Sequence, residues 1–75
     1  MKELVETMAR ALVNNPDQVS VVETVEGDET RLILSVDPAD VGKVIGKQGR
    51  IAKALRSVLK AAASRKDEKV ILDIE

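Results

Sequence analysis

The stretch VIGKQGR, residues 44–50, places two glycines on either side of a two-residue tip, with a lysine in the tip and an arginine after it. Glycine has no Cβ, so it adopts backbone angles that other residues resist and allows a second backbone to come close. The stretch precedes a predicted helix, whose free amides and dipole favour anions. A corner that merely needs glycine to turn is the plain alternative. Because the bend also carries two cations, we expect it to contact the phosphates of a sugar-phosphate backbone.

The residues before this bend predict a helix and then a hairpin. Apolar side chains recur at spacings of three and four within residues 2–13, and Asn14-Asn15-Pro16 ends that pattern. Two strands rich in β-branched residues follow at 19–26 and 30–36, and the turn signal Gly27-Asp28-Glu29 joins them into an antiparallel pair. The expected apolar stripe of the helix consists of Leu4, Val5, Met8, Leu12 and Val13.

The residues around and after the bend predict two helices and a last strand. Asp37 can cap a short helix that has Pro38 at its first position and runs up to the bend. A longer, alanine-rich helix is expected over residues 50–64, and alternating apolar residues in 70–75 predict a strand. The expected apolar stripe of the longer helix consists of Ile51, Leu55, Val58, Leu59 and Ala62.

The predicted order of elements is therefore α-β-β-α-α-β. The chain has 75 residues, which is enough for a single domain over residues 1–75. An α+β fold follows, in which the helices pack on one face of a small three-stranded sheet. The last strand is expected to lie parallel to the second strand, which makes the sheet mixed.

Charge is distributed unevenly along the chain, although the formal net charge is only −1. Residues 1–40 hold 3 Lys or Arg and 9 Asp or Glu, whereas residues 41–66 hold 8 Lys or Arg and no acid. Residues 67–75 are acidic again, with 4 acids and 1 lysine. An acid-free basic segment that contains the glycine bend favours an anion-facing surface, with a solvated helix face as the alternative.

The composition excludes several classes of function. The chain has no Cys and no His, so disulfides, thiol nucleophiles, imidazole bases and the usual zinc ligands are absent, and we expect no metal and no cofactor. It has no aromatic residue on which a base could stack. Its carboxylates fall mostly in turns and caps, so we expect no enzyme. The segment 42–47 departs from a nucleotide phosphate loop, because three residues instead of four separate its glycines and Gln48 follows the lysine.

The run VIGKQGR within an α-β-β-α-α-β order resembles a type II KH domain. More narrowly, DVGKVIGKQGRIAKALRSVLKAA, residues 40–62, resembles the KhpA family of small bacterial KH proteins. The resemblance extends over essentially the whole chain. It implies a type II KH fold and binding of single-stranded RNA. Because Ala52 stands where many KH domains carry a large aliphatic residue, we expect this binding to have low sequence specificity. It also matches 65–69 to a variable loop on the far side of the groove, here short and basic.

The resemblance also implies a set of binding residues. A clamp on about four nucleotides is assigned to Gly46-Lys47-Gln48-Gly49. Ile45 and Ala52 would line the floor of an apolar groove. The cations that would flank the phosphates are Lys43, Arg50 and Lys53.

Several expectations concern the role and the partners of the chain. The KhpA resemblance implies a role as an RNA chaperone or post-transcriptional regulator, and pairing as a homodimer or with a second, larger KH-domain protein. A protein-protein adaptor with a KH fold and a single-stranded DNA-binding domain are the alternatives. Contact surfaces could be the alanine-rich helix over 50–64 or aliphatic residues on the outer sheet face, such as Val22, Ile33 and Ile71. With no targeting or membrane-spanning segment in view, a cytoplasmic protein is expected.

Overall fold

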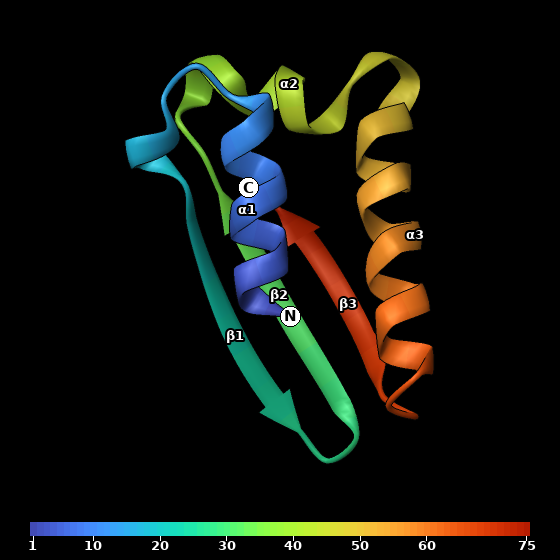
Figure 1. Cartoon of the computed structure of the whole chain (residues 1–75). Coiled ribbons are helices and arrows are strands. Elements are labelled where there is room, and N and C mark those ends of the chain that lie inside the picture. Colours follow the sequence, from blue (N-terminus) through green and yellow to red (C-terminus); the bar gives the residue numbers. More distant parts are fainter.

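The computed structural model describes residues 1–75, in which three helices lie on one face of a three-stranded sheet (Figure 1). The elements in chain order are α1 (Lys2–Leu12), β1 (Ser20–Glu26), β2 (Glu29–Ser35), α2 (Val41–Ile45), α3 (Arg50–Ser64) and β3 (Lys69–Ile74). Single turns of 3-10 helix at Pro16–Gln18, Pro38–Asp40 and Lys47–Gly49 precede β1, α2 and α3. The predicted α-β-β-α-α-β order and the α+β class are confirmed.

The sheet has the strand order β1-β2-β3 and is mixed, as expected. β1 and β2 run antiparallel, with Val21 opposite Leu34, because the turn between them is too short for a crossover. β3 runs parallel to β2, with Leu72 beside Leu32, because α2 and α3 return the chain to the same end of the sheet. The two outer strands therefore flank the most buried strand.

The core lies between the sheet and the helices. Leu32 and Leu34 of β2 are fully buried, since the helices cover the face toward which these alternate residues point. Burying a side chain of this size contributes roughly 1.5–3 kcal/mol. Every helix and strand contributes to one cluster of 11 buried residues, which are Val5, Ala9, Val19, Val21, Leu32, Leu34, Val36, Val44, Leu55, Leu59 and Leu72.

Helix α1 presents a narrower face to the core than its apolar pattern predicted. Val5 and Ala9 are fully buried, whereas Leu4 and Leu12 are each 37% exposed. The prediction for the two leucines was wrong because helix periodicity locates an apolar sector without fixing its centre. The centre of the contact falls on the line from Val5 to Ala9, where a small alanine lets the helix come close to the sheet.

Helix α3 is similarly rotated relative to its predicted stripe. Ala52, Leu55, Leu59 and Ala63 are buried, whereas Val58 is 44% exposed. The two alanines allow α3 to lie close to β3 and α2, with which it packs. Val58 therefore points away from the core, which corrects its predicted position.

The opposite face of the sheet carries no helix (Figure 1). Val22 and Ile71 on this face are 55% and 37% exposed, as the strand alternation predicted. An ion pair between Arg31 and Asp73, with 3.2 Å between nitrogen and oxygen, links β2 to β3 across it. None of the helices has the length and the apolar character that crossing a membrane requires.

Candidate nucleic-acid interface

The predicted bend between α2 and α3 is built from residues in unusual backbone conformations. Gly46, Gln48 and Gly49 have φ angles of +76°, +58° and +74°. The amide of Gly46 donates to the carbonyl oxygen of Gly42 at 2.8 Å and so ends α2. The amide of Gly49 then donates to the carbonyl oxygen of Gly46 at 3.1 Å, which closes the bend into one tight turn.

Gly46 is required for packing as well as for conformation. A Cβ at this position would lie 2.6 Å from Cγ1 and 2.9 Å from Cβ of Ile51. Its φ of +76° with ψ of 174° belongs to a region that is essentially restricted to glycine. Around Gly49, by contrast, nothing lies within 4 Å of an added Cβ. The missing side chain of Gly46 therefore allows the bend to pack closely against Ile51 at the start of α3.

The bend presents its polar side chains to solvent. Lys47, Gln48 and Arg50 are exposed, as is Lys53 one turn along α3. None of these side chains takes part in an ion pair, because the three ion pairs of the chain lie in α1 and across the sheet. The first turn of α3 has no acidic residue and no side-chain cap. The end of the helix and its cations are thus left open for an external anion.

The remaining predicted residues lie beside the bend in α2 and α3. Lys43 and Ile45 are half-buried in the last turn of α2, next to the bend. The structure therefore brings all the predicted binding residues around one corner of the molecule. Ala52 is only 4% exposed and lies beneath that corner, where it supports α3 from inside. Of the two residues predicted to line the floor of the apolar groove, Ile45 is therefore the accessible one.

A buried carboxylate fixes the start of α2. Asp40 is 1% exposed, and its Oδ2 accepts hydrogen bonds from the backbone amide and the side-chain amide of Asn15 at 3.0 and 3.1 Å. Burial on its own would raise the pKa of Asp40, but the hydrogen bonds from Asn15 and Asn14, together with the charge of Lys43, hold this pKa below its ordinary value. A carboxylate tied in this way anchors the segment after α1 to the helix that leads into the bend.

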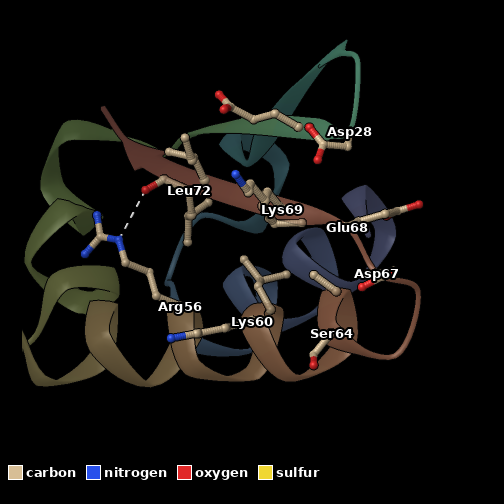
Figure 2. A pocket seen from close by; sticks show the side chains of 13 residues that line it. Asp28, Arg56, Lys60, Ser64, Asp67, Glu68, Lys69 and Leu72 are labelled. Carbon is tan, nitrogen blue, oxygen red and sulfur yellow. Dashed lines mark hydrogen bonds between the residues drawn. The ribbon is translucent and has the colours of Figure 1, made fainter.

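A cleft of about 820 Å³ opens between α3 and β3, on the flank of the helix that starts at the bend (Figure 2). Arg56 and Lys60 stand at one end, and Leu59, Leu72 and other apolar side chains form its wall. Asp28, Asp67 and Glu68 lie toward the other end, and Lys69 lies between the two ends. Asp67, Glu68 and Lys69 of the 65–69 connection, which was expected to be basic, line this space, whereas Arg65 and Lys66 do not.

Arg56 and Lys60 line this cleft but were not among the cations predicted to flank the phosphates. The predicted set of cations stopped at Lys53, although Arg56 and Lys60 continue from it at spacings of three and four. Residues at those spacings are neighbours on one side of a helix. The sequence therefore indicates that these cations share one side of α3, but only the position of β3 shows that this side faces a cleft.

The fold and this corner together define the class of the protein. A hairpin, two helices joined by a GKQG bend and a third strand parallel to the second form a type II KH domain. Residues 2–74 match the family described as KhpA/KhpB, KH domain. Because the match extends over nearly the whole sequence, the chain belongs to the KhpA/KhpB family of KH domains.

Relatives of nearly the same length share about half of its residues. "RNA-binding protein KhpA" of Halalkalibacterium halodurans is 58% identical over 74 residues, covering 99% of this chain and 97% of the relative. Proteins with the same name from Clostridium perfringens and Aquifex aeolicus are 54% and 52% identical, covering 99% of this chain and 99% and 94% of the relatives. These names describe binding and not catalysis, as expected. No solved structure matches the chain.

Proposed function

We propose that this chain binds single-stranded RNA non-covalently through the GKQG bend, with little overall dependence on sequence. The observation that carries the proposal is the pair of exposed cations, Lys47 and Arg50, at an acid-free helix start with no ion-pair partner. Amides of the bend and these two side chains would hold phosphates. That its relatives are named RNA-binding proteins supports the same conclusion.

Single strands fit this corner better than duplexes do. The apolar surface beside the bend is aliphatic and small, with Ile45 half-buried next to Gly46. Unstacked bases can lie against such a surface, whereas bases within a duplex are covered by their neighbours. Most contacts would be made to phosphates, and no aromatic residue is present to stack on a base. The chain should therefore discriminate only weakly between RNA sequences. Such binding suits an RNA chaperone or a post-transcriptional regulator.

The dependence of affinity on salt and on the sugar tests this proposal. For single strands, each phosphate contact contributes a slope of about −0.7 to the plot of log affinity against log salt concentration. We expect a slope of roughly −2, corresponding to about three phosphates, in fluorescence anisotropy titrations with a labelled single-stranded RNA. We also expect weaker binding to DNA of the same sequence, because it lacks the 2′-hydroxyl. An affinity independent of salt would exclude the phosphate clamp, and equal affinities would favour the DNA-binding alternative.

We also infer that the chain pairs with a second KH domain, either its own copy or that of a larger protein. The description of the family joins KhpA with KhpB, and a bend that holds a few nucleotides gains avidity when it is doubled. The outer side of α3 offers a surface for close helix contact, where Val58 is 44% exposed between the exposed residues Ala54 and Ala61. An adaptor role would use this surface without RNA.

Two valine substitutions distinguish the candidate contact surfaces. Val58→Asp should weaken self-association by about tenfold or more, because a charge would lie unpaired in the contact. Val22→Asp places the same charge at a valine that is 55% exposed on the uncovered sheet face, and it should leave association unchanged. Sedimentation equilibrium measures both. If only Val22→Asp dissociated the pair, the contact surface would be the uncovered sheet face. If the wild-type chain were monomeric, self-pairing would be excluded.

A further inference from the structure

Helix α2, which leads into the bend, is too short to keep a direction of its own. It has only five residues, Val41–Ile45, and a helix of little more than one turn is not stable by itself in water. It nevertheless carries two of the residues proposed for RNA binding, Lys43 and Ile45, and it ends at Gly46. The direction of α2, and with it the position of the bend, therefore depends on what holds this helix at its start.

The start of α2 is held by a carboxylate that does not cap the helix. Asp40 stands at the cap position, where an aspartate ordinarily accepts a bond from an early amide of its own helix, but its side chain makes no such bond. Its Oδ2 accepts two bonds from Asn15 instead, at 3.0 Å from the backbone nitrogen and 3.1 Å from Nδ2. These two bonds form the Asp40–Asn15 tie. It joins α2 to the connection between α1 and β1, which lies beside the start of α2 (Figure 1).

Burial makes the Asp40–Asn15 tie specific for one arrangement of α2. Asp40 is the only charged residue that is buried, and it takes part in no ion pair. A buried carboxylate is costly unless its hydrogen bonds are made, so directions of α2 that break the bonds from Asn15 are disfavoured. An aliphatic side chain could fill the same space, but it would accept no bond from Asn15. The carboxylate therefore supplies direction in addition to packing.

The distance from Asp40 to the bend makes the proposed clamp sensitive to this tie. Gly46 follows Asp40 by six residues, which corresponds to about 9 Å along a helix axis. A tilt of α2 by about 15° at its start would therefore move the bend by roughly 2 Å. Hydrogen bonds to phosphate oxygens tolerate much less, because donor and acceptor must lie about 2.7–3.2 Å apart. Lys43 and Ile45 would move together with the bend.

We propose that Asp40 is a positioning residue for RNA binding, which acts through Asn15 to set the direction of α2 and the place of the bend. The proposal rests on the proposed function, because it takes the bend as the part of the chain that holds the RNA. Asp40 itself does not touch the RNA, since it is only 1% exposed. The connection between α1 and β1, residues 13–19, has no Lys or Arg, and it contributes to the clamp through this tie.

Three substitutions in the full chain separate the tie from the charge, with a labelled uridine decamer as the probe. Asp40→Asn removes the charge but keeps an oxygen that can accept both bonds from Asn15, so the affinity should stay within about twofold. Asp40→Ala removes the acceptor, and we expect binding to weaken by about tenfold or more. Asn15→Ala removes only the bond from Nδ2 at an exposed position, so it should fold normally and weaken binding by about fivefold.

An RNA-free measurement and a matched control distinguish positioning from a general loss of stability. The NMR amide resonances of Gly46 and Gly49 should shift in Asp40→Ala and stay close to wild type in Asp40→Asn. Val5→Ala is the control, because Val5 is fully buried in the N-terminal half of α1, the half that lies away from α2 (Figure 1). It destabilises the core without touching the tie, so the glycine resonances and the RNA affinity of the folded chain should not change.

Three results would overturn the positioning role of Asp40 and leave the clamp standing. Asp40→Ala and Asn15→Ala could bind the decamer as tightly as the wild-type chain, Asp40→Asn could lose as much affinity as Asp40→Ala, or Val5→Ala could lose the same amount. Failure of the wild-type chain to bind the decamer would overturn the clamp instead. In that case the glycine resonances of the RNA-free variants would still decide whether Asp40 sets the position of the bend.

Discussion

The double substitution Lys47→Asp with Gln48→Asp should lower the affinity for single-stranded RNA by about 100-fold or more and leave the fold intact. Both side chains are exposed at the tip of the bend, so neither contributes to the core. Two carboxylates would face the phosphates at close range where a lysine stood, and opposing like charges cost several kcal/mol. Aspartate also tolerates the positive φ of +58° at Gln48 better than most residues do.

A control with the same chemistry is available far from the bend. Lys2 and Gln18 are also exposed, and changing both to Asp alters the net charge of the chain by the same amount. Anisotropy titrations should show near wild-type affinity for this control, and circular dichroism should show unchanged structure for both double variants. If the variant at the bend bound RNA as tightly as the control, the bend would not be the binding site, and the adaptor alternative would gain support.

Gly46→Ala should destabilise the chain by about 2–4 kcal/mol, which combines backbone strain with overpacking. The new methyl group would lie 2.6 Å from the Cγ1 atom of Ile51 and 3.0 Å from its backbone nitrogen, so the start of α3 would have to move. A domain of this length is stable by only roughly 4–11 kcal/mol. The loss is therefore a large fraction of the total and should appear as a clear shift of the urea midpoint.

The other glycines of the region provide graded controls for Gly46. Gly49→Ala should cost only about 1–2 kcal/mol, since its φ of +74° is strained for alanine but its surroundings are open. Gly42→Ala should be neutral or stabilising by about 0.5–1 kcal/mol, because Gly42 lies inside α2 in open space. Equal urea midpoints for the Gly46 and Gly42 variants would contradict the close contact with Ile51.

The sequence alone determined the elements and the candidate corner. Local periodicity predicted α1, the hairpin and α3 within one or two residues at each end, because side chains alternate along a strand and repeat about every 3.6 residues in a helix. The capping role of Asp37 was equally local, and its Oδ1 accepts the amide of Ala39 at 2.8 Å. The GKQG bend was found because glycines and cations adjacent in the chain must also be adjacent in space.

Only the tertiary structure decided which side of each helix is buried and what lies across from it. Periodicity locates an apolar sector without fixing its centre, so the packing of α3 against β3 and α2 decided that Val58 is exposed. The contacts of Asp40 with Asn15 and of Arg56 with Leu72 join residues 25 and 16 positions apart. No local pattern encodes such pairs, because the distance between their atoms is set by packing of the whole domain.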